Sequence, residues 1–127
     1  MGTIRYTIEH NQPDTIIVTW AALTKTAGVL DVGQRLVLPG YDNRSVEVYG
    51  TFGAAGKVAI YGSNNTDLTA TGRLLTDQSD NNLEFTTAKL EQILQIAYQM
   101  WPEVTVGEDA VTTLTVKMTC KRIPPGR

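Results

Sequence analysis

Apolar and polar residues alternate at every second position along most of this chain, and this pattern constrains the fold more than any other feature. It is clearest from Leu114 to Cys120, where apolar side chains alternate with threonines and a lysine. Successive side chains of a β-strand point to opposite faces, so the pattern predicts a strand with one buried face. The same alternation at Ile4, Tyr6 and Ile8 predicts a strand near the N-terminus.

Further short strands are predicted between clusters of turn-forming residues. They are expected at 15–23, 35–38, 45–52, 56–62 and 73–75. In the first of these, the core-facing residues are expected to be Ile16, Val18, Trp20 and Ala22. Cys120 shares the apolar face of the last strand, so we interpret it as a small core residue and not as a nucleophile.

The segment from 89 to 107 allows two interpretations. An apolar stripe at helical spacing passes through Leu90, Leu94 and Trp101 but leaves Ile96 and Met100 on the wrong side. A strand over 94–106 leaves only Trp101 unexplained and is favoured for that reason. The residues just before it, 86–92, are expected to form a single helical turn.

Three glycines, Gly50, Gly53 and Gly56, follow an apolar run and raise the question of a phosphate-binding loop. Their spacing differs from the dinucleotide-binding pattern, and the residues that follow predict a strand where a phosphate loop needs a helix. Glycines at such spacing suit a turn that needs positive φ. We therefore interpret the segment as the turn of a β-hairpin.

Composition argues against several classes of function. The net charge of −2 does not provide the basic surface that nucleic-acid binding usually needs. One cysteine and one histidine, His10, offer too few partners for a zinc site or a nucleophile–base pair. The acidic residues between 67 and 84 match no EF-hand spacing and are interpreted as turn residues. We expect no enzyme activity, no cofactor and no metal.

Membrane association is not expected either. No apolar run approaches the roughly 20 residues that a membrane-spanning helix needs, and the N-terminus lacks the pattern of a signal peptide. The chain is therefore expected to be soluble and to be made in the cytoplasm.

Several exposed side chains are candidates for partner contact. On the strand interpretation Trp101 projects away from the core, where it would either meet a ligand or partner or be covered by a loop of the same chain. Tyr49 and Tyr61 are expected on the outward faces of neighbouring hairpin strands, where they could share one surface with it. The basic residues near the chain ends complete the set: Arg5, Lys121, Arg122 and Arg127.

Together these patterns predict an all-β fold, a jelly-roll-like antiparallel β-sandwich of about seven or eight strands. One domain is expected over 1–127, with short arms at 1–3 and 122–127. The alternative that the residues leave open is a carbohydrate-binding sandwich with the three aromatic residues as its platform.

The order of motifs from 45 to 122 resembles that of small virion proteins of tailed bacteriophages. These motifs are a strand–turn–strand unit ending in Gly-Ser-Asn at 62–64, a Leu-Thr-Asp turn at 75–77, an aromatic strand with Pro102, and a closing Thr-Val strand with basic residues. Such proteins include capsid decoration, or cement, proteins with a jelly-roll fold.

The resemblance implies a structural role with the major capsid protein as the partner. A cement protein lies on the outer capsid surface as a dimer or trimer and bridges neighbouring subunits. Two departures, at 65–67 and in the extra residue before Pro102, leave a tail or head-completion role as an alternative.

Overall fold

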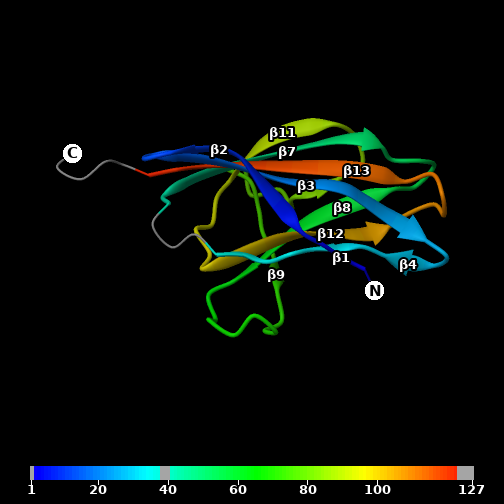
Figure 1. Cartoon of the computed structure of the whole chain (residues 1–127), viewed down its shortest axis with the longest axis horizontal. Helices are drawn as coiled ribbons and strands as arrows, with labels where there is room; N and C mark the ends of the chain where they lie inside the picture. Colours follow the sequence, from blue (N-terminus) through cyan, green and yellow to red (C-terminus); the bar gives the residue numbers. More distant parts are fainter. Residues whose placement is uncertain (1, 38–40, 123–127) are drawn as a thin grey trace.

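Two β-sheets packed face to face form the structure, a computed structural model that describes residues 2–37 and 41–122, except the side chains of His10 and Asn11 (Figure 1). Sheet A contains β1 (Thr3–Ile4), β5 (Val32–Gly33), β6 (Leu36–Val37), β8 (Lys57–Ser63), β9 (Arg73–Leu74), β10 (Glu84–Phe85) and β12 (Gln99–Val106). Sheet B contains β2 (Tyr6–Gln12), β3 (Thr15–Thr26), β4 (Val29–Leu30), β7 (Asn43–Thr51), β11 (Lys89–Ile93) and β13 (Thr113–Lys121).

The strand order confirms the expected all-β sandwich. The main path of sheet A is β1-β5-β12-β8-β10, and that of sheet B is β11-β7-β13-β3-β2. Along the chain, the longer strands from β7 to β13 alternate between the two sheets, as in a jelly roll. The last strand, β13, lies in the middle of sheet B and pairs antiparallel with β3 and β7.

The apolar faces predicted from the alternation form the core between the sheets. Leu114, Val116, Met118 and Cys120 are fully buried, as are Val18 and Trp20. Burial raises the pKa of the Cys120 thiol to about 11, so the group stays protonated and unreactive near neutral pH. The interpretation of Cys120 as a core residue is confirmed.

The N-terminal strand divides between the sheets. β1 pairs parallel with β5 in sheet A, whereas β2 pairs with β3 in sheet B, and the change occurs at Arg5. Thr3, expected in an arm, lies in this ladder, and the carbonyl of Gly2 just before it accepts a hydrogen bond from the amide of Val32 over 2.8 Å.

A β-bulge corrects the prediction for β3. Opposite Thr115 of β13 the register shifts, so that two residues of β3 face one residue of its neighbour. Ala22 takes a positive φ of 59° at this point and is exposed, and Leu23 is fully buried in its place. The prediction of Ala22 in the core was wrong because a bulge reverses the faces of every residue beyond it.

The segment 89–106 is also only partly as predicted. β12 confirms a strand over 99–106, but 94–98 is an irregular connection, and Leu94 and Ile96 are 45% and 54% exposed. The helical turn expected over 86–92 is absent, and β11 lies at 89–93 in its place. The short strand expected at 35–38 is found as β6, with position 38 outside the described residues, and the one expected at 73–75 is found as β9.

The glycine-rich segment is a turn, but the strands beside it do not form a hairpin. β7 belongs to sheet B and β8 to sheet A, so residues 52–56 carry the chain from one sheet to the other. Gly50 and Gly53 have φ values of 129° and 78°, which confirms the expected need for glycine. The predicted pairing of β7 with β8 was wrong, because alternation of apolar and polar residues identifies a strand but not the strands it pairs with.

The same turn leads to a stability prediction. A Cβ at Gly56 would lie 1.8 Å from the Phe52 carbonyl oxygen, which is part of the backbone and cannot rotate away. Gly56→Ala is therefore expected to lower the free energy of unfolding by about 1–3 kcal/mol, as measured by urea denaturation. The matched change in the exposed neighbour, Ala55→Ser, should stay within about 0.5 kcal/mol of the original chain. Equal effects from the two changes would contradict the prediction.

Candidate interaction surface

Trp101 lies on the outer face of sheet A, as the strand interpretation predicts, but it is covered by its own chain. Its side chain is only 2% exposed. The Tyr61 ring stacks on it at 6.4 Å, and the Arg35 guanidinium lies 3.8 Å from its ring centroid. Gly72 packs so closely that a Cβ there would lie 2.4 Å from the indole ring. Of the two alternatives for Trp101, coverage by a loop of the same chain is the one found.

The covering loop, residues 64–72, extends away from the two sheets between β8 and β9 (Figure 1). The first residues of this loop are held in place by Gln99, which is fully buried. The side-chain amide of Gln99 donates to the carbonyls of Asn65 and Asp67, both over 2.8 Å. Its carbonyl accepts a hydrogen bond from Arg35. The loop therefore has a fixed base, and Leu68 within it is 55% exposed.

Replacing Gln99 should release this loop. Gln99→Ala removes both bonds to the loop carbonyls, and we expect amide hydrogen exchange within 64–72 to become at least about tenfold faster, which corresponds to about 1.4 kcal/mol of lost local stability. Exchange in β13 should change much less. Gln78→Ala, at an exposed glutamine, serves as the control. Unchanged exchange in the loop would show that other contacts hold it.

The aromatic platform expected for a carbohydrate site is not assembled. Tyr61 lies on β8 of sheet A, whereas Tyr49, 39% exposed, lies on β7 of sheet B. The two rings therefore occupy different sheets of the sandwich. The prediction of one shared surface was wrong because it depended on the hairpin that does not form.

The basic candidates within the described residues lie at different places in the fold. Lys121 is paired with Thr15, at the same end of sheet B as Gln12, whereas Arg5 precedes Tyr6 at the other end of β2. The Arg122 side chain donates to the Pro13 carbonyl over 2.8 Å and lies 5.7 Å from the Tyr41 ring. Arg127 lies outside the described residues. Partner contact by these residues stays a prediction.

Two open hollows lie side by side on sheet B, where β11, β7 and β13 meet. Their volumes are about 370 and 510 Å³, and they share Asn43, Gln92 and Lys121 as lining residues. Leu90 lines the first hollow and Leu94 the second. Leu90 is 67% exposed, although it is a large apolar side chain on an edge strand. This surface was not among the predicted candidates.

A buried arginine was also not predicted. Arg44, 2% exposed, reaches from β7 to the connection before β12, where it donates to the Ala97 carbonyl over 2.7 Å and contacts the Met100 sulfur at 3.3 Å. Burial lowers the pKa of its guanidinium from the ordinary value. The sequence did carry a signal. Arg44 lies two and four residues before the core residues Val46 and Val48, so it falls on the same face of the strand.

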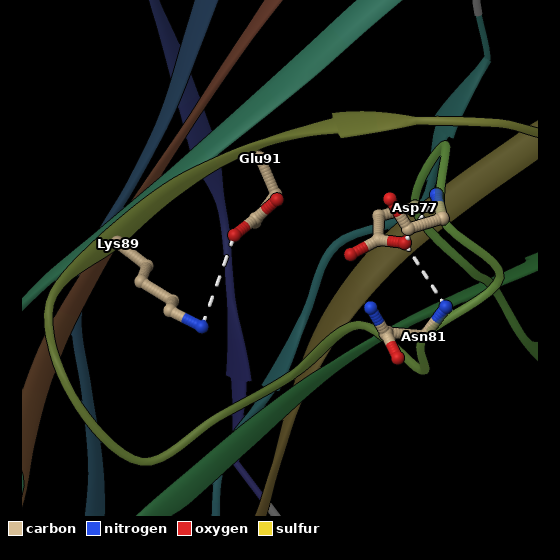
Figure 2. A network of polar contacts seen from close by, with 5 residues as sticks. Asp77, Asn81, Lys89 and Glu91 are labelled. Carbon is tan, nitrogen blue, oxygen red and sulfur yellow. Dashed lines mark hydrogen bonds and ion pairs between the residues drawn. The ribbon is translucent and has the colours of Figure 1, made fainter.

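The acidic turn at 76–82 is organised by its own backbone. The carboxylate of Asp77 accepts hydrogen bonds from the amides of Ser79 and Asn81, and Lys89 lies near Glu91 on β11 (Figure 2). Within residues 2–37 and 41–122 no three His, Cys, Asp or Glu side chains are grouped to hold a metal ion. These two bonds account for the position of the Asp77 carboxylate in the turn.

These bonds give a pH prediction for Asp77. The Asn81 amide is the main cause that lowers the pKa of the Asp77 carboxyl below its ordinary value of 3.8. A lowered folded pKa stabilises the fold above the unfolded pKa, and this contribution is lost as the pH falls through the folded pKa. An NMR titration should place the midpoint of the Asp77 carboxyl below the ordinary value of 3.8. A midpoint at or above 3.8 would contradict the turn geometry.

No protein-family model and no curated protein sequence matches the chain. Among solved structures, the fold is similar to that of the SPBc2 prophage-derived protein YomS. The two chains are 16% identical, with a TM-score of 0.62 over 90% of this chain and 98% of the other. At this identity the similarity shows a shared fold.

In the part of the chain that the structure describes, no helix is long and apolar enough to cross a membrane.

Proposed function

We propose that this chain is a structural virion protein of a tailed bacteriophage, and that it is a cement protein that bridges major capsid subunits on the outside of the head. The observation that carries the proposal is the fold shared with a prophage-derived protein over 98% of that protein's length. The series of motifs between 45 and 122 supports it independently, because it resembles small phage virion proteins. On this proposal the chain acts through binding, with no catalytic step.

We place the capsid contact on the 64–72 loop. Its base is held by Gln99, so little conformational entropy is lost when the loop binds. Leu68 offers an exposed apolar anchor on this ordered loop, and Arg73 beside it adds a charge at the rim. A stable clamp would bury on the order of 1,000 Å² or more.

Quantitative mass spectrometry of purified source virions tests the proposal, with the major capsid protein as the internal reference. A cement protein is expected at a copy number comparable to that of the major capsid protein. A few copies per particle would indicate the portal or the tail instead. Absence from the particles would overturn the virion role.

The carbohydrate-binding alternative loses its main support, because Trp101 is covered and the two tyrosines lie on different sheets. Binding of purified heads to the Leu68→Asp variant, compared with the Val111→Asp variant, would test the contact surface, because Val111 is an exposed apolar residue in the turn before β13. Only the Leu68 change is expected to weaken head binding.

A further inference from the structure

We propose that the edge strand β11 pairs antiparallel with β11 of a second copy of this chain, in the register that places Leu90 opposite Leu90 of the partner. The resulting two-fold dimer joins sheet B of the two copies into one continuous sheet. This inference does not rest on the proposed virion role, because it concerns the purified chain alone.

The backbone of β11 is available for such pairing. Within the described residues β11 is hydrogen-bonded to β7 on one side and ends the strand order of sheet B. The amide of Leu94 donates to Thr76, away from β7. Amides alternate in direction along an extended strand, so every second amide of β11 points to the open edge. The proposal assigns the amides of Leu90 and Gln92 to this set, because the Leu94 amide just beyond the strand bonds to Thr76 and not to β7. An exposed edge of this kind is a template for another strand.

The charges on β11 select the register. With Leu90 at the two-fold axis, Lys89 of each copy faces Glu91 of the other, so the dimer contains two identical opposite-charge pairs. These are positions without direct backbone hydrogen bonds between them, where facing side chains approach most closely. Charged residues often protect an edge strand from pairing, but here their order makes the strand complementary to itself. A shift by one residue either way breaks this match.

The apolar contact agrees with the same register. Leu90 is the most exposed of the large apolar side chains on the described surface, at 67%. In the dimer the two Leu90 side chains lie opposite each other on the outer face, beside the hollow that Leu90 lines. Pairing of 88–92 in both copies adds about six backbone hydrogen bonds. The ladder ends before Leu94, whose amide is already bonded to Thr76.

Sedimentation velocity over a range of concentrations tests the proposal. The original chain is expected to approach twice its mass of 13.9 kDa. Lys89→Glu and Glu91→Lys each turn both opposite-charge pairs into like-charge pairs, and each should weaken the dimer by about tenfold to a hundredfold. Asp14→Lys, an exposed charge change in the turn between β2 and β3, at the opposite edge of sheet B, should leave the dimer unchanged.

Two combinations should restore the dimer. The double variant with Lys89→Glu and Glu91→Lys regains self-complementarity, and an equimolar mixture of the two single variants should form mixed dimers, detectable by native mass spectrometry. Circular dichroism and thermal unfolding should show that all variants stay folded. A chain that stays monomeric, single variants that dimerise as tightly as the original, or a mixture without rescue would each overturn the proposal. None of these outcomes affects the copy number measured in virions.

Discussion

Trp20→Ala is expected to lower the free energy of unfolding by about 3–5 kcal/mol, the largest effect of any single change described. Trp20 is fully buried between the sheets, and its indole N–H donates to the Gln34 carbonyl over 2.9 Å. The Tyr6 ring meets it edge-on at 5.8 Å. Truncation therefore leaves a cavity, an unpaired carbonyl and a lost aromatic contact at once.

Urea denaturation followed by circular dichroism measures this change. Trp20→Phe keeps most of the volume but loses the hydrogen bond, so it should cost about 1–3 kcal/mol and remain measurable even if the alanine variant does not fold. Leu68→Ala, at an exposed position, serves as the control and should stay within about 0.5 kcal/mol. A loss below about 1 kcal/mol for Trp20→Ala would contradict its place in the core.

Trp101→Ala is expected to lower the free energy of unfolding by about 3 kcal/mol, near the low end of the range for truncated tryptophans. The indole is enclosed by Tyr61, Arg35 and Gly72, so its removal leaves these groups without a packing partner. Its N–H also bonds to Glu103 over 3.2 Å. The cost should be lower than for Trp20, since Trp101 lies outside the cluster of core residues between the sheets.

This second prediction separates a structural tryptophan from one that binds a ligand. A platform tryptophan contributes little to stability, so its truncation would change the free energy of unfolding by less than about 0.5 kcal/mol. Amide exchange in 64–72 should also become faster in Trp101→Ala, because the loop packs on the ring. Tyr49→Ala, on the outer face of sheet B, is the matched aromatic control.

Sequence reasoning succeeded where periodicity alone decides the outcome. The alternation around Met118 identified a strand and its buried face, because burial and pleating have the same period. It failed at Ala22, where one inserted residue reverses the faces, and at β7 and β8, which follow each other in sequence but lie in different sheets. Both failures have one cause: pairing depends on contacts between distant segments, which a local pattern does not record.

The candidate surface was less predictable than the fold. The sequence showed that Trp101 faces away from the core, but it could not show that Gly72, Tyr61 and Arg35 pack around its ring. The free edge of β11 was hidden because the segment was expected to be helical. The burial of Arg44 could have been predicted, since the residue lies on the same strand face as Val46 and Val48. It was missed because an arginine interrupts the apolar pattern on that face.

The central place of β13 in sheet B also governs when the chain can fold. Until residues 113–121 have been synthesised, the β2–β3 pair and the β7–β11 pair have no strand to join them. Before β13 is present the two strand pairs keep unpaired edges, and the sandwich can close only after β13 has joined them. A fragment that stops before Thr113 is left with two open half-sheets, and such open edges make a fragment prone to aggregation.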